Sequence, residues 1–70
     1  MATPIFDIFR GHFGETDAMW VESVRGLGNA ADRMYALAAE KPGAYFVFCP
    51  DSRTAVASVD VPAKADRKSA

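Results

Sequence analysis

The order of hydrophobic and polar positions along the chain predicts four strands and one helix. Residues 5–10 (IFDIFR) and 18–25 (AMWVESVR) are rich in β-branched and aromatic side chains, which is typical of strands. The glycine-containing segment 11–17 between them predicts the turn of an antiparallel hairpin.

Residues 26–41 change to the spacing of a helix with one apolar stripe. Gly26 is the expected N-cap, and Pro42 with Gly43 is expected to end the helix because proline disfavours helical geometry in the residue before it. The positions that share the stripe are Leu27, Ala30, Ala31, Met34, Leu37, Ala38 and Lys41.

The C-terminal half predicts a second hairpin. Residues 44–49 form its first strand, residues 50–53 (PDSR) its turn, and residues 54–61 its second strand, which Pro62 ends because proline cannot donate to a sheet. Strict alternation would place Ala55, Ala57, Val59 and Val61 on one face of this last strand, and Thr54, Val56, Ser58 and Asp60 on the other.

The element order β-β-α-β-β defines an α+β fold. The helix returns the chain, so the strands before and after it run parallel, and placing the first strand between them gives the spatial order 2-1-3-4 with all neighbours antiparallel. We expect a single domain over residues 5–61, a flexible start at 1–4 and a disordered basic tail at 62–70.

The strand at residues 44–49 is apolar on both faces. Tyr45 and Val47 point to one side of the sheet, and Phe46 and Phe48 point to the other. One short helix covers only one side, and alternation leaves open which side that is. The other face is therefore expected to pack against something else. The candidate interface residues are Trp20, Tyr45, Phe46 and Phe48.

Composition indicates what supplies the remaining stability. A chain of this size has a marginal core, and the single cysteine, Cys49, and single histidine, His12, allow neither an internal disulfide nor a four-ligand zinc site. Oligomerisation is the remaining way to stabilise so small a core, so we expect a homodimer without a metal or other cofactor.

Charge and hydropathy restrict the kinds of partner that we expect the protein to bind. The net charge is −1, and the tail carries +2, which leaves −3 for the body and disfavours binding to nucleic acid. The chain has no secretory leader pattern and no long apolar run, so we expect a cytoplasmic protein that does not enter the membrane.

Three segments of the chain together form a pattern. They are Trp20-Val-Glu-Ser-Val, the predicted helix with its Ala, Leu and Arg residues, and Pro42-Gly-x-Tyr-Phe-Val-Phe. This pattern resembles a group of short bacterial proteins of unknown function, over residues 5–60. The resemblance implies the fold, and it identifies no catalytic or binding residues.

Three candidate chemical sites have simpler explanations. Cys49 would be a reactive thiol if a cation such as Arg53 approached it, but a small hydrophobic role is favoured. His12 is expected to be an exposed turn residue rather than a base. Asp7 and Glu22 would share a site only if they met across the first hairpin, and carboxylates that are solvated or that meet an arginine such as Arg10 or Arg25 are favoured.

The sequence therefore predicts no catalytic residues and favours a small homodimeric interaction or accessory protein over an enzyme. The alternative is a protein that binds a small ligand or nucleic acid on the open sheet face or between subunits. Residues 43–48 resemble the aromatic strand of the RNA-recognition motif, but the acidic body and the single helix argue against that function.

Overall fold

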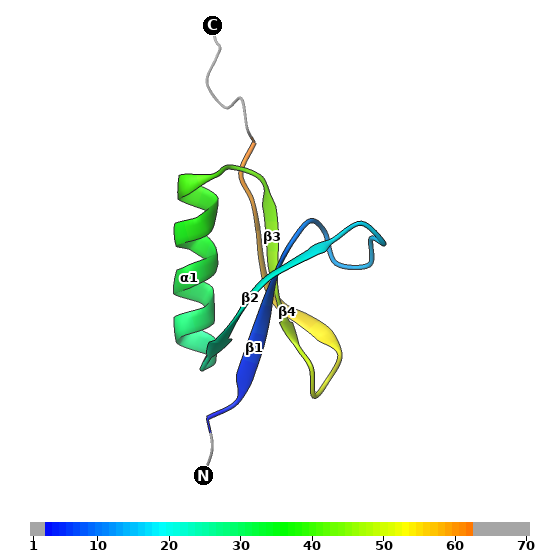
Figure 1. Ribbon diagram of the computed structural model, residues 1–70, viewed down its shortest axis with the longest axis vertical. Coiled ribbons are helices and arrows are strands. Elements are labelled where there is room, and N and C mark those ends of the chain that lie inside the picture. Colours follow the sequence, from blue (N-terminus) through cyan, green and yellow to red (C-terminus); the bar gives the residue numbers. More distant parts are fainter. Residues whose placement is uncertain (1–2, 63–70) are drawn as a thin grey trace, which may run out of the picture.

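The computed structural model describes residues 3–62. Its elements follow the predicted order β-β-α-β-β (Figure 1). Residues 1–2 of the expected flexible start, and residues 63–70 of the expected disordered tail, lie outside the described residues. The elements are β1 (Ile5–Arg10), β2 (Met19–Arg25), α1 (Leu27–Glu40), β3 (Ala44–Cys49) and β4 (Thr54–Asp60).

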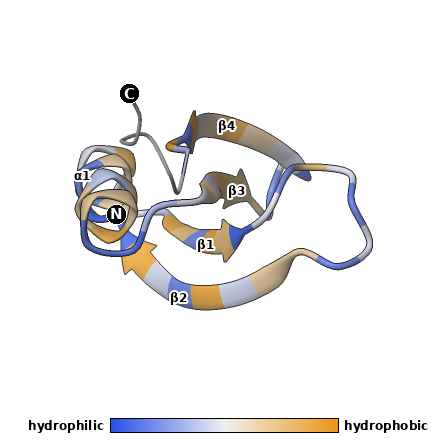
Figure 2. Cartoon of the chain, turned by 90° about the horizontal axis from the view of Figure 1, so that it is seen from above, coloured by the Kyte–Doolittle hydropathy of each residue, from blue (hydrophilic) through white to orange (hydrophobic). Residues whose placement is uncertain are grey.

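The strands form one antiparallel sheet in the order β2-β1-β3-β4, which confirms the predicted topology. Seen from above, α1 lies against one side of this sheet, and the loop between β1 and β2 extends away from the helix (Figure 2). The sheet therefore has one face that the helix covers and one that it leaves open.

Helix α1 begins after the predicted N-cap, Gly26, and ends at Glu40, one residue earlier than expected. Its C-cap, Lys41, has extended backbone and donates its N–H to the Leu37 carbonyl. The side chains at helical spacing that it buries are Ala30, Met34 and Ala38.

The core lies between the helix and the sheet, and it decides which face of β3 is covered. Tyr45 and Val47 pack beneath α1 with Phe6 and Ile8 of β1. Phe46 and Phe48 therefore lie on the opposite face. Among the described residues, the buried cluster that forms this core consists of Phe6, Ile8, Ala30, Met34, Ala38, Tyr45 and Val47.

Two β-bulges modify the simple alternation of the strands. One shifts the register between β1 and β2 at Ile8/Phe9, and the other shifts it between β3 and β4 at Val47/Phe48. Because of the second bulge, Ala55 pairs with Phe48 while Ala57 pairs with Val47. The prediction that Ala55 shares a face with Ala57 was therefore wrong.

A polar clamp fixes the chain reversal after α1. The Arg10 guanidinium donates to the Tyr45 hydroxyl at 2.8 Å and to the Pro42 carbonyl at 3.1 Å, and it lies 5.3 Å from the centre of the Tyr45 ring. The Tyr45 hydroxyl donates to the Lys41 carbonyl at 2.7 Å. These bonds satisfy the carbonyl of the C-cap Lys41 and that of Pro42 in the turn after the helix.

Candidate functional site

The face of the sheet opposite α1, called here the helix-free face, carries a cluster of aromatic rings. Phe9 of β1 stacks on Phe46 of β3 with a ring separation of 5.2 Å, and it meets Phe48 edge-on at 6.0 Å. These residues belong to the two central strands, so the cluster lies in the middle of the sheet.

The loop between β1 and β2 covers part of this face. Its Phe13 meets the Phe46 ring edge-on at 5.7 Å and lies 6.1 Å from the Phe48 ring. Phe46 is only 4% exposed as a result, whereas Phe13 itself remains 53% exposed. The loop projects from the sheet on the side away from α1 (Figure 1). The helix-free face is thus partly closed by the chain's own loop.

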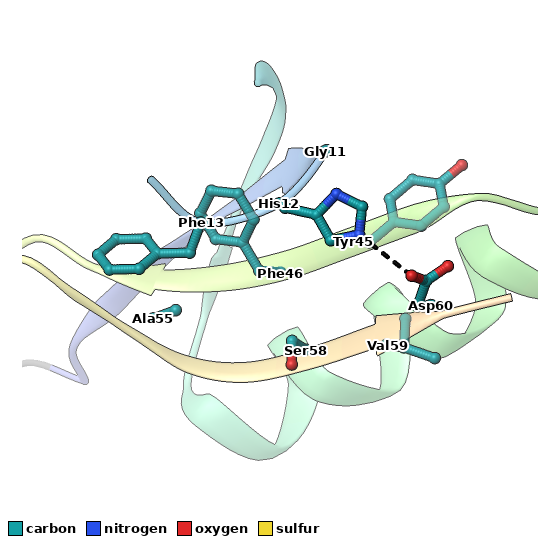
Figure 3. Close-up of a pocket in the computed structure, with 9 residues that line it drawn as sticks. All are labelled: Gly11, His12, Phe13, Tyr45, Phe46, Ala55, Ser58, Val59 and Asp60. Carbon is teal, nitrogen blue, oxygen red and sulfur yellow. Dashed lines mark hydrogen bonds and ion pairs between the residues drawn. The ribbon is translucent and has the colours of Figure 1, made fainter. Parts of the chain in front are cut away.

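Between this loop and β4 lies a groove of about 380 Å³, called here the β4 groove. Phe46 forms part of its floor, Phe13 stands at one end, and His12 and Asp60 meet at the other (Figure 3). The groove therefore combines aromatic walls with a polar end. Its lining residues are Gly11, His12, Phe13, Tyr45, Phe46, Ala55, Ser58, Val59 and Asp60.

His12 joins the loop to the edge strand at the polar end of the groove. Its Nε2 lies 3.1 Å from Asp60 Oδ2, and its Nδ1 lies 3.4 Å from Glu15 Oε1. The hydrogen bond to Asp60 raises the pKa of His12 above its ordinary value of 6.5, and the hydrogen bond and charge of Glu15 add to this effect. The prediction that His12 is an exposed turn residue is confirmed, and the structure adds two carboxylate partners, Asp60 and Glu15.

Replacing Asp60 by asparagine is expected to lower the pKa of His12 toward 6.5, because the largest cause of its elevation is removed. The pair stabilises the fold fully below pH 6.5, and this contribution is lost as the pH rises through the elevated pKa of the folded protein. An NMR titration of His12, the single histidine, measures the effect. Asp17→Asn in the same loop is the control. A His12 pKa that does not fall in Asp60→Asn would contradict the assignment.

Trp20 of β2 lies at the other side of the helix-free face. It pairs with Phe9, and residues directly opposite each other in an antiparallel pair share a face. The indole is 58% exposed, so its large apolar surface stands in water. The side chains of the helix-free face are, strand by strand, Trp20, Ser23 and Arg25, then Ile5, Asp7 and Phe9, then Ala44, Phe46 and Phe48, then Ala55, Ser58 and Asp60, with Phe13 from the loop.

Three of the four candidate interface residues belong to this face. Trp20, Phe46 and Phe48 lie on it, whereas Tyr45 is 3% exposed beneath the helix, where its hydroxyl is part of the clamp. Tyr45 is therefore a core residue, and its ring is not part of the helix-free face although the residue is among those that border the β4 groove.

The structure separates the two carboxylates that could have shared a site. Asp7 lies on the helix-free face and accepts a hydrogen bond of 2.6 Å from the Ser23 hydroxyl. Glu22 lies on the helix side and pairs with the Arg33 guanidinium at 2.9 Å. A shared acid–base site across the first hairpin is thus ruled out by the register.

Cys49 lies half-buried at the start of the β3–β4 turn. A hydrogen bond from the Ser52 side chain, with smaller contributions from the backbone of Ser52 and Asp51, lowers the pKa of its thiol. Arg53, proposed as the cation that would approach Cys49, does not contribute to this shift. The thiol also packs against the edge of the core, in keeping with its favoured hydrophobic role.

Other kinds of site find no support in the part of the chain that the structure describes. Residues 3–62 contain no group of three His, Cys, Asp or Glu side chains placed to hold a metal ion. The same residues include no helix with the length and apolar character needed to cross a bilayer.

Comparisons with known proteins add no assignment. The chain matches no family model, no curated protein and no solved structure. The class of protein defined so far is thus a small β-β-α-β-β protein with an aromatic, partly exposed sheet face.

Sequence reasoning missed two residues of this face. Phe13 was assigned only to the turn at residues 11–17, and Asp60 only to one face of the last strand. A lone phenylalanine between Gly11 and Gly14 is a usable signal, because a large apolar residue in a polar turn is often held against the body of the protein. The partnership of His12 with Asp60 spans 48 positions and has no local signal.

Proposed function

We propose that the protein is a small homodimeric interaction module whose two copies pack through their helix-free faces. The observation that carries the proposal is the contiguous aromatic surface of this face, on which Trp20 and Phe13 are 58% and 53% exposed. Exposed apolar patches of this kind are characteristic of sites of association.

Energetics favour a second copy as the occupant. Burying about 600 Å² of apolar surface per subunit would contribute on the order of 15 kcal/mol before the costs of association. A stable interface commonly buries about 800 Å² per partner, and the chain exposes 4646 Å² in all. Packing two sheets face to face is a common solution, and in a four-stranded sheet it would cover the exposed side chains of both helix-free faces.

Charge argues against a polyanion on this surface. The central strands contribute apolar side chains and Asp7, while Asp60 and Glu15 make the loop end acidic around His12, and the basic Arg25 lies at the far end of the edge strand β2. A nucleic acid would require basic groups to neutralise its phosphates. A second apolar face has no such requirement.

Phe48→Asp is expected to convert the dimer into a folded monomer, because the new carboxylate would lie in the centre of the interface next to Asp7. Light scattering on a size-exclusion column at micromolar concentration measures the mass. Tyr35→Asp is the matched control, since Tyr35 is exposed on α1. Circular dichroism verifies the fold of both variants.

Two results would contradict the proposal: a monomeric parent chain, or a folded Phe48→Asp variant that remains a dimer. If Phe48→Asp does not fold, Ile5→Asp tests the same face, because Ile5 is half-exposed and lies outside the core. A dimeric Ile5→Asp variant would then count against the helix-free face.

The β4 groove supports a second candidate function, the binding of a small planar ligand. Its aromatic walls and the acceptor groups of Ser58 and Asp60 suit a ring that bears a hydrogen-bond donor. Isothermal titration calorimetry across a panel of aromatic amines would detect such a ligand. A monomeric chain that binds one of them with micromolar affinity would favour this function over the dimer.

A further inference from the structure

We propose that in the dimer the Trp20 indole of each subunit fills the β4 groove of its partner. This inference rests on the proposed function, and it names the residue that each copy supplies to the other.

A protruding side chain and a hollow lie in the same row of the sheet. Register pairs Trp20 with Phe9, Phe9 with Phe46, and Phe46 with Ser58, so these four residues form one line across the helix-free face. Trp20 stands at the β2 end and is exposed, whereas Ser58 at the β4 end lines the groove. The two ends are three strand spacings apart, or about 14 Å.

Symmetry brings these two ends together. In a face-to-face dimer, a two-fold axis parallel to the strands and midway between β1 and β3 exchanges the β2 side of one copy with the β4 side of the other. Each Trp20 then faces the partner's Ser58, and each Phe9 faces the partner's Phe46. This arrangement also keeps the strands of the two sheets nearly aligned, as in common sandwiches.

The groove has the chemistry that an indole requires. Phe46 and Phe13 offer aromatic surfaces that already meet edge-on, and a third ring can continue such packing. A buried indole N–H needs an acceptor. Asp60 uses Oδ2 for His12, and its Oδ1 and the exposed Ser58 hydroxyl lie at the polar side of the groove.

The first test uses Trp20 as its own probe, since it is the single tryptophan. Its emission is expected to shift to shorter wavelength as the chain dimerises on concentration. Ser58→Phe, which fills the groove, is expected to raise the dimer dissociation constant about 30-fold or more, because it displaces a buried tryptophan, and to leave Trp20 with solvent-exposed emission. Ala36→Phe is the control, because Ala36 is exposed on α1, away from the helix-free face.

The second test locates the symmetry axis by cross-linking in a Cys49→Ser background. A second row crosses the same face beside the row that contains Trp20. In it Ser23 pairs with Asp7, Asp7 pairs with Phe48, and Phe48 pairs with Ala55. The same axis therefore sets Ser23 against the partner's Ala55. A mixture of Ser23→Cys and Ala55→Cys chains should be joined by a bismaleimide that spans about 10 Å, the usual separation of packed sheets. Neither variant alone should be joined.

The outcomes separate this inference from the proposed function. A dimer in which Trp20 keeps solvent-exposed emission, or in which Ser23→Cys alone is cross-linked, would overturn the groove assignment and leave the homodimer standing. A chain that stays monomeric at all accessible concentrations would overturn both. Blue-shifted Trp20 that returns to exposed emission in Ser58→Phe, with cross-linking of the mixed pair, would support both.

Discussion

Alanine in place of Met34 is expected to lower the free energy of unfolding by about 2–5 kcal/mol. Met34 is 0% exposed at the centre of α1, and it packs in the cluster that joins the helix to the sheet. A cavity there is costly because the core has few large side chains to spare. The largest fully buried side chains among the described residues are Ile8, Val47 and Met34 itself. A domain of this length has little reserve to absorb such a loss.

Urea unfolding followed by circular dichroism measures the effect. All variants are compared at one protein concentration, because dimer formation makes apparent stability depend on concentration. Tyr35→Ala is the control, since Tyr35 is next in sequence but 54% exposed, and a change within about 0.5 kcal/mol is expected there. If Met34→Ala does not fold, Met34→Leu should cost less than about 1.5 kcal/mol. Equal stability of the Met34 and Tyr35 alanine variants would contradict the assigned core.

Alanine in place of Gly43 is expected to destabilise the protein by about 2–3 kcal/mol, for two separate reasons. The backbone of Gly43 has φ +156°, which side-chain-bearing residues rarely adopt. A Cβ there would also lie 2.9 Å from Arg10 Nη2, and this guanidinium is held by Tyr45 and Pro42. The Arg10 side chain could move only by giving up these bonds at the end of α1.

Two other glycines serve as matched controls in the same unfolding experiment. Gly14 has φ +95° but open space around an added Cβ, so Gly14→Ala should cost only the backbone strain, about 1 kcal/mol. Gly28 lies in α1 with no atom near an added Cβ, so Gly28→Ala should stabilise the protein by up to about 1 kcal/mol. A Gly43→Ala variant no less stable than Gly14→Ala would show that the Arg10 clamp contributes little.

These predictions depend on features that sequence and structure reveal to different degrees. Met34 was identified from sequence as a core position, because its spacing from Ala30 and Ala38 defines one helical face. The clamp was not, because Arg10 and Tyr45 are 35 positions apart and nothing local links them. Gly43 was expected only as a stop for the helix.

The candidate site shows the same division. The sequence indicated that one apolar sheet face would be left free by the helix, and it offered Trp20, Tyr45, Phe46 and Phe48 as candidates for that face. It could not assign Tyr45 or Phe46 to a side, because both faces of β3 are apolar and alternation alone is symmetric. Packing against Met34 decides this, and it buries Tyr45.

By itself the sequence determined the β-β-α-β-β order, the strand order 2-1-3-4 and the apolar stripe of the helix. Those features follow from local periodicity, turn residues and chain connectivity. Only the tertiary structure decided the bulge that turns Ala55 to the helix-free face, the position of Phe13 over Phe46, and the contact between His12 and Asp60. These depend on contacts between residues far apart in the chain, which no local pattern encodes.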